Sequence, residues 1–490
     1  MMTGSRMRLS VAVAALLLAL PAPAQAAGEI RYASLTILHT NDLHGHLFPF
    51  DYDAFGVEET DVGGAARRAT IIRQLKSAAN GPVLVMDAGD AFMRGPLDDL
   101  HGVPDFDVMN AVPYDVMTLG NNEFKGAPGE QGLKILLDRI RQARFAVLSA
   151  NVLDKSTRKK IVAPSKVFDL KGLRVGVLGL TAPRVASYEQ AKTLEVRDPV
   201  IAAKQAVAGM RSECDFIVAL THIGYPRDLE LAALVPEIDV VIGGDSHTWT
   251  FQPTLVRTAD DRAPAWWIGG TLVCQAGEWG RSLGKLELNL RRDDLGRFRV
   301  AAFRGELVEV NASAVPAPDV ERIIERYARP FRRVLGNIPA SVPKSQAPDW
   351  VAARIREAAG ADVGAVPLRA VENGLKAGAV TELDVRSMFP WVNPVVRLTV
   401  TGKQLREFAS ELAVALAGAR LVDGIIYVGK RRLADWETCT LAVEEFYADT
   451  SAALSSAPRA AIGMTTRDVV TRYLSVRRAS IERLGCPLGG

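Results

Sequence analysis

The chain has 490 residues, of which 48% are hydrophobic and 23% charged, so it is long enough to form more than one globular domain. Its formal net charge of +3 is too small a bias to argue for binding to nucleic acid or to an anionic membrane surface. We therefore expect no nucleic-acid partner.

The first residues have the pattern of a secretory signal peptide. Arg6 and Arg8 form a basic start, residues 10–20 form an apolar run, and residues 24–26 offer small side chains for cleavage. This run is shorter than the roughly 20 apolar residues that a membrane span needs, and no later segment approaches that length. We expect removal of residues 1–26 and a periplasmic or secreted protein without a membrane span. A buried N-terminal helix is the alternative.

Short apolar runs then alternate with amphipathic ones up to about residue 290. The runs that are typical of buried strands are 34–40, 82–88, 145–151, 174–181, 215–224 and 238–245. Helical spacing of apolar residues is found in 65–79, 134–144 and 198–213. This alternation predicts an α/β domain over residues 29–310, and in such domains functional groups collect just beyond the strand ends.

A composition shift follows this domain. Apolar residues from Val320 to Leu335 lie on one face of a predicted helix over 318–338, which Pro330 is expected to kink or break. We interpret this helix as a link to a smaller α/β unit over residues 340–490.

The four cysteines give no metal or redox motif. Cys214, Cys274, Cys439 and Cys486 form no C-x-x-C pair, so a zinc or redox site is not indicated. Export permits a disulfide between Cys439 and Cys486, and buried free thiols are the alternative.

Polar blocks follow the predicted strands, and five of the six histidines lie in them. The blocks are HTNDLHGH (39–46), MDAGD (86–90), LGNNEF (119–124), LTHIGY (220–225) and GGDSHT (243–248). Any single block can be explained by the preference of Asp, Asn and Gly for turns. Five such blocks at the strand ends of one α/β domain present the nitrogen and oxygen ligands that a site for two metal ions needs.

With these blocks in this order, the chain resembles the 5'-nucleotidase family of calcineurin-like metallophosphoesterases, as a divergent member. Residues 376–405 resemble the C-terminal substrate domain of that family. The resemblance implies a four-layer sandwich of two mixed sheets flanked by helices, plus a smaller α/β C-terminal domain. It also implies a hydrolase of phosphoester bonds that is similar to 5'-nucleotidase, UDP-sugar hydrolase or cyclic phosphodiesterase.

The same resemblance implies a metal site with a shared carboxylate. Its expected ligands are Asp42, His44 and His247 for one ion, Asn121, His222 and Asp245 for the other, and Asp90 between them. The ions would be Mn²⁺, Mg²⁺ or Zn²⁺, and an activated hydroxide would attack phosphorus in line. The substrate would be a small phosphorylated molecule, with nucleotides among the candidates.

Three positions near the predicted metal site depart from the family pattern. Asn122 replaces the general-acid His, and Lys125 replaces the Asp that orients it. Asn122 can donate a hydrogen bond to a phosphoryl oxygen but cannot deliver a proton, and general acid–base help is typically worth 10²–10⁴-fold in rate. Asp245 replaces a metal-binding His. The alternative is that Asp245 is a turn residue beside a weak or empty second site.

The predicted substrate domain departs further. Glu372 stands near the place of a phosphate-holding Arg, which leaves Arg369 as the candidate, while Phe389 and Trp391 keep aromatic character for substrate binding. Two alternatives to the hydrolase remain open. One is a metal-binding protein with weakened catalysis whose cleft binds a ligand or partner. The other is a sulfur-ester hydrolase similar to the thiosulfate-oxidation hydrolases.

Overall fold

The computed structural model describes residues 31–54, 56–258, 264–389 and 391–483. The expected signal peptide and Cys486 lie outside the described residues. Within them, no helix combines the length and apolar character that crossing a membrane requires. The three cysteines in the described part, Cys214, Cys274 and Cys439, are buried free thiols.

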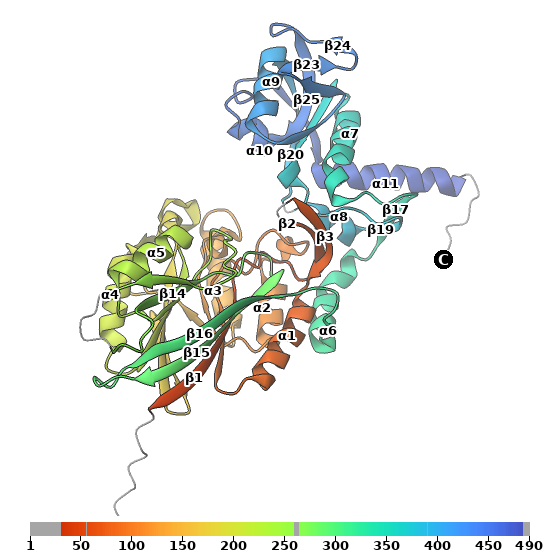
Figure 1. Cartoon of the computed structure of the whole chain (residues 1–490). Helices are drawn as coiled ribbons and strands as arrows, with labels where there is room; N and C mark the ends of the chain where they lie inside the picture. The colour runs from red at the N-terminus through yellow and green to blue at the C-terminus, as the bar shows by residue number, and fades with distance from the viewer. Residues whose placement is uncertain (1–30, 55, 259–263, 390, 484–490) are drawn as a thin grey trace, which may run out of the picture.

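The chain forms two lobes, and the N-terminal lobe contains two mixed six-stranded sheets (Figure 1). The strand order of the first sheet is β16 (Phe298–Glu309), β15 (Ser282–Arg292), β1 (Tyr32–Thr40), β4 (Val83–Asp87), β5 (Val116–Thr118) and β6 (Ala146–Leu148). The order of the second is β13 (Thr254–Arg257), β14 (Gly270–Cys274), β12 (Val240–Ile242), β11 (Phe216–His222), β9 (Leu173–Thr181) and β8 (Ser165–Leu170). A small pair, β7 (Val152–Asp154) and β10 (Leu194–Val196), lies apart from both.

Alternating side chains of these strands build the layers. Ile37 of β1 belongs to the apolar cluster between the two sheets, together with Val218 of β11. The next residue, Leu38, points the other way into a cluster with helices α1 (Ala65–Ala78), α2 (Val103–Ala111) and α6 (Pro318–Ala328). Helices α4 (Pro199–Met210) and α5 (Tyr225–Leu234) cover the outer face of the second sheet. The lobe is therefore a sandwich of helices, sheet, sheet and helices, as the sequence predicts.

The central strands of both sheets are parallel, which places their carboxyl ends at common edges. In the first sheet, Thr40 at the end of β1 pairs with Asp87 at the end of β4. In the second, His222 at the end of β11 pairs with Thr181 at the end of β9. The loops that follow these strands carry the polar blocks.

The six apolar runs all contain strands, and the three amphipathic runs match α1, α3 (Glu130–Gln142) and α4. The prediction of one linking helix over 318–338 is wrong beyond Ala328. A short 3-10 turn, Arg329–Phe331, follows α6, and Val334–Ile338 forms strand β17. Pro330 explains the break, because proline has no N–H to continue the helical hydrogen bonds.

The C-terminal lobe is built on a mixed five-stranded sheet. Its strand order is β21 (Val414–Ala417), β18 (Val363–Pro367), β25 (Thr438–Glu444), β20 (Pro394–Thr401) and β26 (Arg459–Thr465). The helices of the lobe are α7 (Ala347–Ala359), α8 (Glu382–Met388), α9 (Gly402–Glu411), α10 (Glu445–Thr450) and α11 (Thr466–Arg483). The remaining strands are β17 with β19 (Gly378–Thr381), and β22 (Ala419–Val422), β23 (Ile425–Val428) and β24 (Arg431–Arg432).

A hairpin of β2 (Pro49–Ala54) and β3 (Val57–Gly63) reaches from the first lobe to the second (Figure 1). The backbone N–H of Asp51 donates to Asn373 Oδ1 at 2.9 Å, and Lys344 Nζ donates to the Asp51 carbonyl at 3.1 Å. The hairpin therefore helps to join the lobes beside the carboxyl ends of the N-terminal strands.

Candidate active site

The seven predicted metal ligands lie together at the carboxyl edges of the two N-terminal sheets. They follow β1 (Asp42, His44), β4 (Asp90), β5 (Asn121) and β12 (Asp245, His247), and His222 is the last residue of β11. Two groups among them place all of their ligand atoms within 4.8 Å of one another, namely Asp42–His44–His247 and Asp42–Asp90–His222. Strand order thus assembles groups that are up to about two hundred residues apart in sequence.

The first group surrounds Oδ1 of Asp42. Nε2 of His247 lies 3.2 Å from this oxygen and 3.3 Å from Nε2 of His44. Asp42 is fully buried, yet its Oδ1 meets no hydrogen-bond donor of suitable geometry among the described residues. A buried carboxylate oxygen facing two imidazole nitrogens without a hydrogen bond fits a divalent cation.

The second group centres on His222. Its Nε2 lies 3.3 Å from Asp90 Oδ2 and 3.9 Å from Asp42 Oδ1. Its Nδ1 lies 2.7 Å from the Ala88 carbonyl, which holds the ring with Nε2 towards the carboxylates. Burial opposes the charged imidazole, but the carboxylates of Asp90 and Asp42 raise the pKa of His222 well above its usual value.

The backbone at the predicted ligands is unusual. Asp42, His44, Asp90, Asp245 and His247 have φ angles of 52°, 47°, 56°, 81° and 53°. Such left-handed conformations are uncommon for residues other than glycine, and they cluster at functional sites where the surrounding fold maintains them.

Arg184 also reaches the site, and the sequence did not identify it. It lies in a 3-10 turn, Pro183–Ser187, just after β9. Its Nη1 donates to Asp245 Oδ2 at 2.7 Å, and its Nη2 contacts Asp245 Oδ1 and Asn121 Oδ1. A guanidinium group therefore engages two of the three ligands expected for the second ion.

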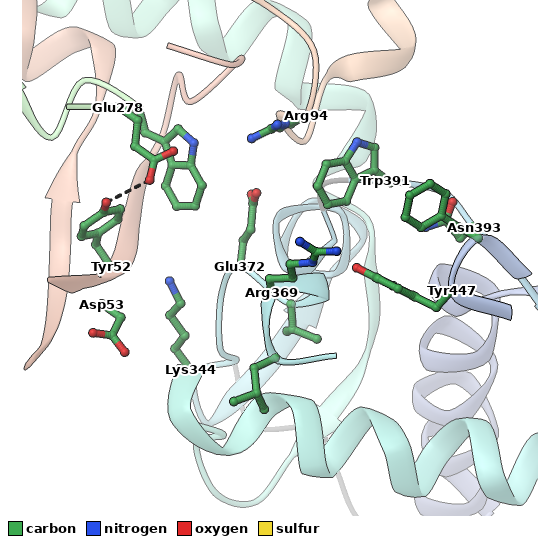
Figure 2. A pocket seen from close by; sticks show the side chains of 14 residues that line it. Tyr52, Asp53, Arg94, Glu278, Lys344, Arg369, Glu372, Trp391, Asn393 and Tyr447 are labelled. Atoms are coloured by element: carbon green, nitrogen blue, oxygen red, sulfur yellow. Dashed lines mark hydrogen bonds between the residues drawn. The ribbon is translucent and has the colours of Figure 1, made fainter. Parts of the chain in front are cut away.

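A pocket of about 730 Å³ opens beside the metal ligands, between the two lobes. Glu278 lines it and also bonds His247, with Oε2 and Nδ1 2.5 Å apart. Cationic side chains enter it from both lobes, namely Arg94, Lys344 and Arg369 (Figure 2). Aromatic residues form much of the remaining wall: Tyr52, Trp279, Trp391, Phe446 and Tyr447.

Comparison with known proteins agrees with this architecture. Residues 35–249 match the family model of calcineurin-like phosphoesterases, and residues 333–427 match that of the 5'-nucleotidase C-terminal domain. The chain belongs to the 5'-nucleotidase family of calcineurin-like phosphoesterases. This is a family of hydrolases that act on phosphoester bonds.

Alignments with individual relatives of this chain extend over most of its length. A 5'-nucleotidase of Vibrio cholerae is 29% identical over 80% of this chain and 78% of its own. Protein UshA of Yersinia enterocolitica is 28% identical over 83% and 82%. The solved structure of a 5'-nucleotidase precursor from Thermus thermophilus has a TM-score of 0.67 at 25% identity, covering 91% of this chain and 97% of its own. A sulfate thiohydrolase, SoxB, from Thermus thermophilus shares the fold, with a TM-score of 0.66 at 18% identity.

In this 5'-nucleotidase family member, Asn122 contacts the central carboxylate. Its N–H donates to Asp90 Oδ1 at 2.8 Å, and its Nδ2 donates to Asp90 Oδ2 at 2.5 Å. The Asn122 amide is thus directed at Asp90, a contact that the sequence did not indicate. The half-buried Lys125 places its Nζ 4.6 Å from the centre of the Tyr188 ring.

Two glutamates support the ligands, and the sequence assigned neither of them a role. The buried carboxylate of Glu123 accepts backbone N–H bonds from Asp90, Ala91 and Gly120 at 3.0, 2.7 and 2.7 Å. Burial, with the nearby Asp90 charge, raises the pKa of Glu123 to about 8. Glu278 accepts the Tyr52 hydroxyl at 2.9 Å while it contacts His247. Glu123 lies in the block that follows β5 and Glu278 lies in the loop after β14, but only the fold reveals their partners.

The predicted substrate residues of this phosphoesterase separate into two sets. Arg369 and Trp391 line the pocket. Phe389 is only 1% exposed and belongs to the hydrophobic core of the C-terminal lobe, so the prediction that it binds substrate is corrected. It follows α8 directly, and its aromatic ring is needed to fill that core. Glu372 pairs instead with His46 of the other lobe, with Oε2 and Nε2 3.3 Å apart.

Proposed function

We propose that this chain is an exported, metal-dependent phosphoester hydrolase that acts on a small phosphorylated substrate. The observation that carries this proposal is the convergence of Asp42, His44, Asp90, His222 and His247 beside a pocket that offers cationic and aromatic side chains. Export rests on the pattern of residues 1–26.

The chain's own residues take distinct roles in this proposal. Asp42, His44 and His247 hold a divalent ion such as Mn²⁺, which would lower the pKa of a bound water and polarise a phosphoryl oxygen. Glu278 fixes His247 through Nδ1 and so keeps Nε2 directed at the ion site. Asn122 holds the Asp90 carboxylate through both oxygens.

The pocket supports a nucleotide as one member of the substrate class. Arg94, Lys344 and Arg369 can pair with phosphate oxygens, and Trp391 or Tyr447 can stack on a planar ring. Arg94 already lies 5.1 Å from the centre of the Trp391 ring, so cation and aromatic groups from both lobes meet there (Figure 2).

The residue at position 122 limits which leaving groups the proposed enzyme can expel efficiently. An amide cannot deliver a proton to a departing alkoxide, so the proposed enzyme works best on esters whose leaving group needs little protonation. Aryl phosphates and phosphoanhydride-linked substrates meet this condition better than simple alkyl monoesters.

The test is an assay of the purified mature chain with Mn²⁺ on a panel that includes p-nitrophenyl phosphate, bis-p-nitrophenyl phosphate, a UDP-sugar and AMP. We expect turnover that EDTA abolishes and that Asp42→Asn removes. Asp138→Asn, which changes a partly exposed carboxylate of α3 paired with Arg141, serves as the matched control and should retain full activity. Absence of turnover on every ester in metal-loaded protein would refute the proposal. Cell fractionation and N-terminal sequencing test export separately.

A further inference from the structure

The guanidinium of Arg184 occupies a position among the ligands that the family resemblance assigns to a second ion. It pairs with both carboxylate oxygens of Asp245 and with Oδ1 of Asn121. Bidentate pairing with a carboxylate is the strongest geometry available to an arginine. The oxygens of both residues, Asn121 and Asp245, that a second cation would need are therefore already bound to a cation of the chain itself.

The charges of the side chains in the site also favour one divalent ion over two. Asp245 adds a third carboxylate to those of Asp42 and Asp90, at a position where the family resemblance expects a neutral histidine. The Asp245 side chain is only 9% exposed, and an unpaired carboxylate there would be costly. With Arg184 the pair is neutral, so the three aspartates and Arg184 together carry −2, the charge that one divalent ion neutralises.

The three ligands of the first group are close enough to one another to serve a single ion. Oδ1 of Asp42 lies 3.7 Å from His44 Nε2 and 3.2 Å from His247 Nε2, and the two imidazole nitrogens lie 3.3 Å apart. Ligands about 2.1 Å from a common metal ion are roughly 3–3.5 Å apart, so small adjustments bring these atoms onto one ion.

Lys125, which also departs from the family pattern, holds the segment that carries Arg184 in place. Tyr188 follows the turn that carries Arg184, and Lys125 places its ammonium group over the Tyr188 ring. A cation over an aromatic face is attractive by about 0.5–2 kcal/mol. The departures at positions 125 and 245 therefore both involve the Pro183–Tyr188 segment.

We propose that Arg184 takes the place of the second divalent ion, so that the site holds one metal ion and one fixed guanidinium. The Arg184 side chain is 49% exposed, which leaves part of the guanidinium open to a bound phosphoryl group. Its charge does not depend on metal supply. This inference rests on the metal-dependent function proposed above and deepens it.

Metal counting tests the inference without reference to turnover. Full-length mature protein is stripped with a chelator, saturated with Mn²⁺, desalted and analysed for bound manganese, and the electron paramagnetic resonance spectrum is recorded. We expect one ion per chain in the wild type and in Arg184→Lys, with the spectrum of an isolated Mn²⁺. In Arg184→Ala and Arg184→Gln we expect two ions, with the altered spectrum of an exchange-coupled pair.

The matched control is Arg174→Ala. Arg174 pairs with Asp215 in the same bidentate way, and its side chain is 46% exposed beside a carboxylate that is 6% exposed, against 49% and 9% for Arg184 and Asp245. This control should keep one ion.

Three results would overturn the inference: two ions in the wild type, one ion in both neutral Arg184 variants, or a second ion gained equally by Arg174→Ala. Arg184→Gln keeps much of the side-chain length, so a folded neutral variant is available if Arg184→Ala unfolds. Failure of every ester assay with one ion bound would count against the proposed function and leave the metal count intact.

Discussion

Glu278 offers a sharp test of how the site holds His247. Its Oε2 lies 2.5 Å from His247 Nδ1, and its Oε1 accepts the Tyr52 hydroxyl at 2.9 Å. Glutamine at this position can accept from His247 through its oxygen and donate to the Tyr52 hydroxyl through its NH2 group. Glu278→Gln therefore loses the charge-assisted bond to His247, which becomes at best a bond to a neutral amide, and the negative charge beside the imidazole.

The expected cost falls on metal affinity. Loss of a carboxylate partner of a metal-binding histidine typically weakens metal affinity 10–100-fold, which is about 1.4–2.8 kcal/mol. Glu278 is 16% exposed in its side chain, so solvent replaces the lost bond only in part. Tyr52→Phe removes the other bond of Glu278 and leaves the contact with His247, so we expect it to weaken affinity by less than threefold, or about 0.6 kcal/mol.

Competition with a fluorescent chelator measures these affinities on stripped protein. Glu59→Gln is the control, because Glu59 is a partly buried carboxylate that pairs with Arg281. A dissociation constant for Glu278→Gln within twofold of the wild type would refute the argument that this carboxylate orients His247.

Three further predictions address the proton, the buried acids and the pocket. Asn122→His should raise kcat/KM for alkyl phosphates by at least about tenfold and leave p-nitrophenyl phosphate nearly unchanged, and equal effects on both substrates would contradict the lost-acid account. Burial raises the pKa of Asp87 to about 7, although the Thr40 hydroxyl and the Gly89 N–H favour its charged form. The folded state then holds a proton that the unfolded chain releases, so the free energy of unfolding should fall as pH rises from about 4 to 7, by at most ~4 kcal/mol, and Asp87→Asn should lose this fall in urea titrations at several pH values. Phe389→Ala should cost about 3–5 kcal/mol of stability. Trp391→Ala changes a residue that is 39% exposed and should mainly raise KM. Thermal unfolding measures the first effect, and substrate titration measures the second.

Apolar periodicity predicted the strands that carry the site because those strands are buried on both faces. β1, β9 and β11 are mostly apolar and mostly buried, and such runs stand out in sequence. β5 has only three residues, so its position was evident only from the asparagines that follow it. The β2–β3 hairpin was not predicted, since its half-exposed strands lack a long apolar run.

Side-chain partners were beyond the reach of the sequence. Arg184 and Asp245 are 61 residues apart, and one arginine among 59 basic residues carries no signal of its own. The metal-ligand candidates were found because histidine is rare here and five of the six histidines lie in polar blocks at strand ends. Phe389 and Trp391 looked alike as aromatic residues, and only their packing separates a core side chain from a pocket side chain.

The expected metal ligands and much of the substrate pocket come from different lobes. All seven expected ligands come from residues 42–247, whereas the pocket takes Lys344, Arg369, Trp391 and Tyr447 from the C-terminal lobe. A rotation of that lobe would reshape the substrate wall and leave the ligands where they are. Recognition can therefore diverge among descendants of this chain by changes in one lobe, while the reaction centre in the other stays under separate constraint.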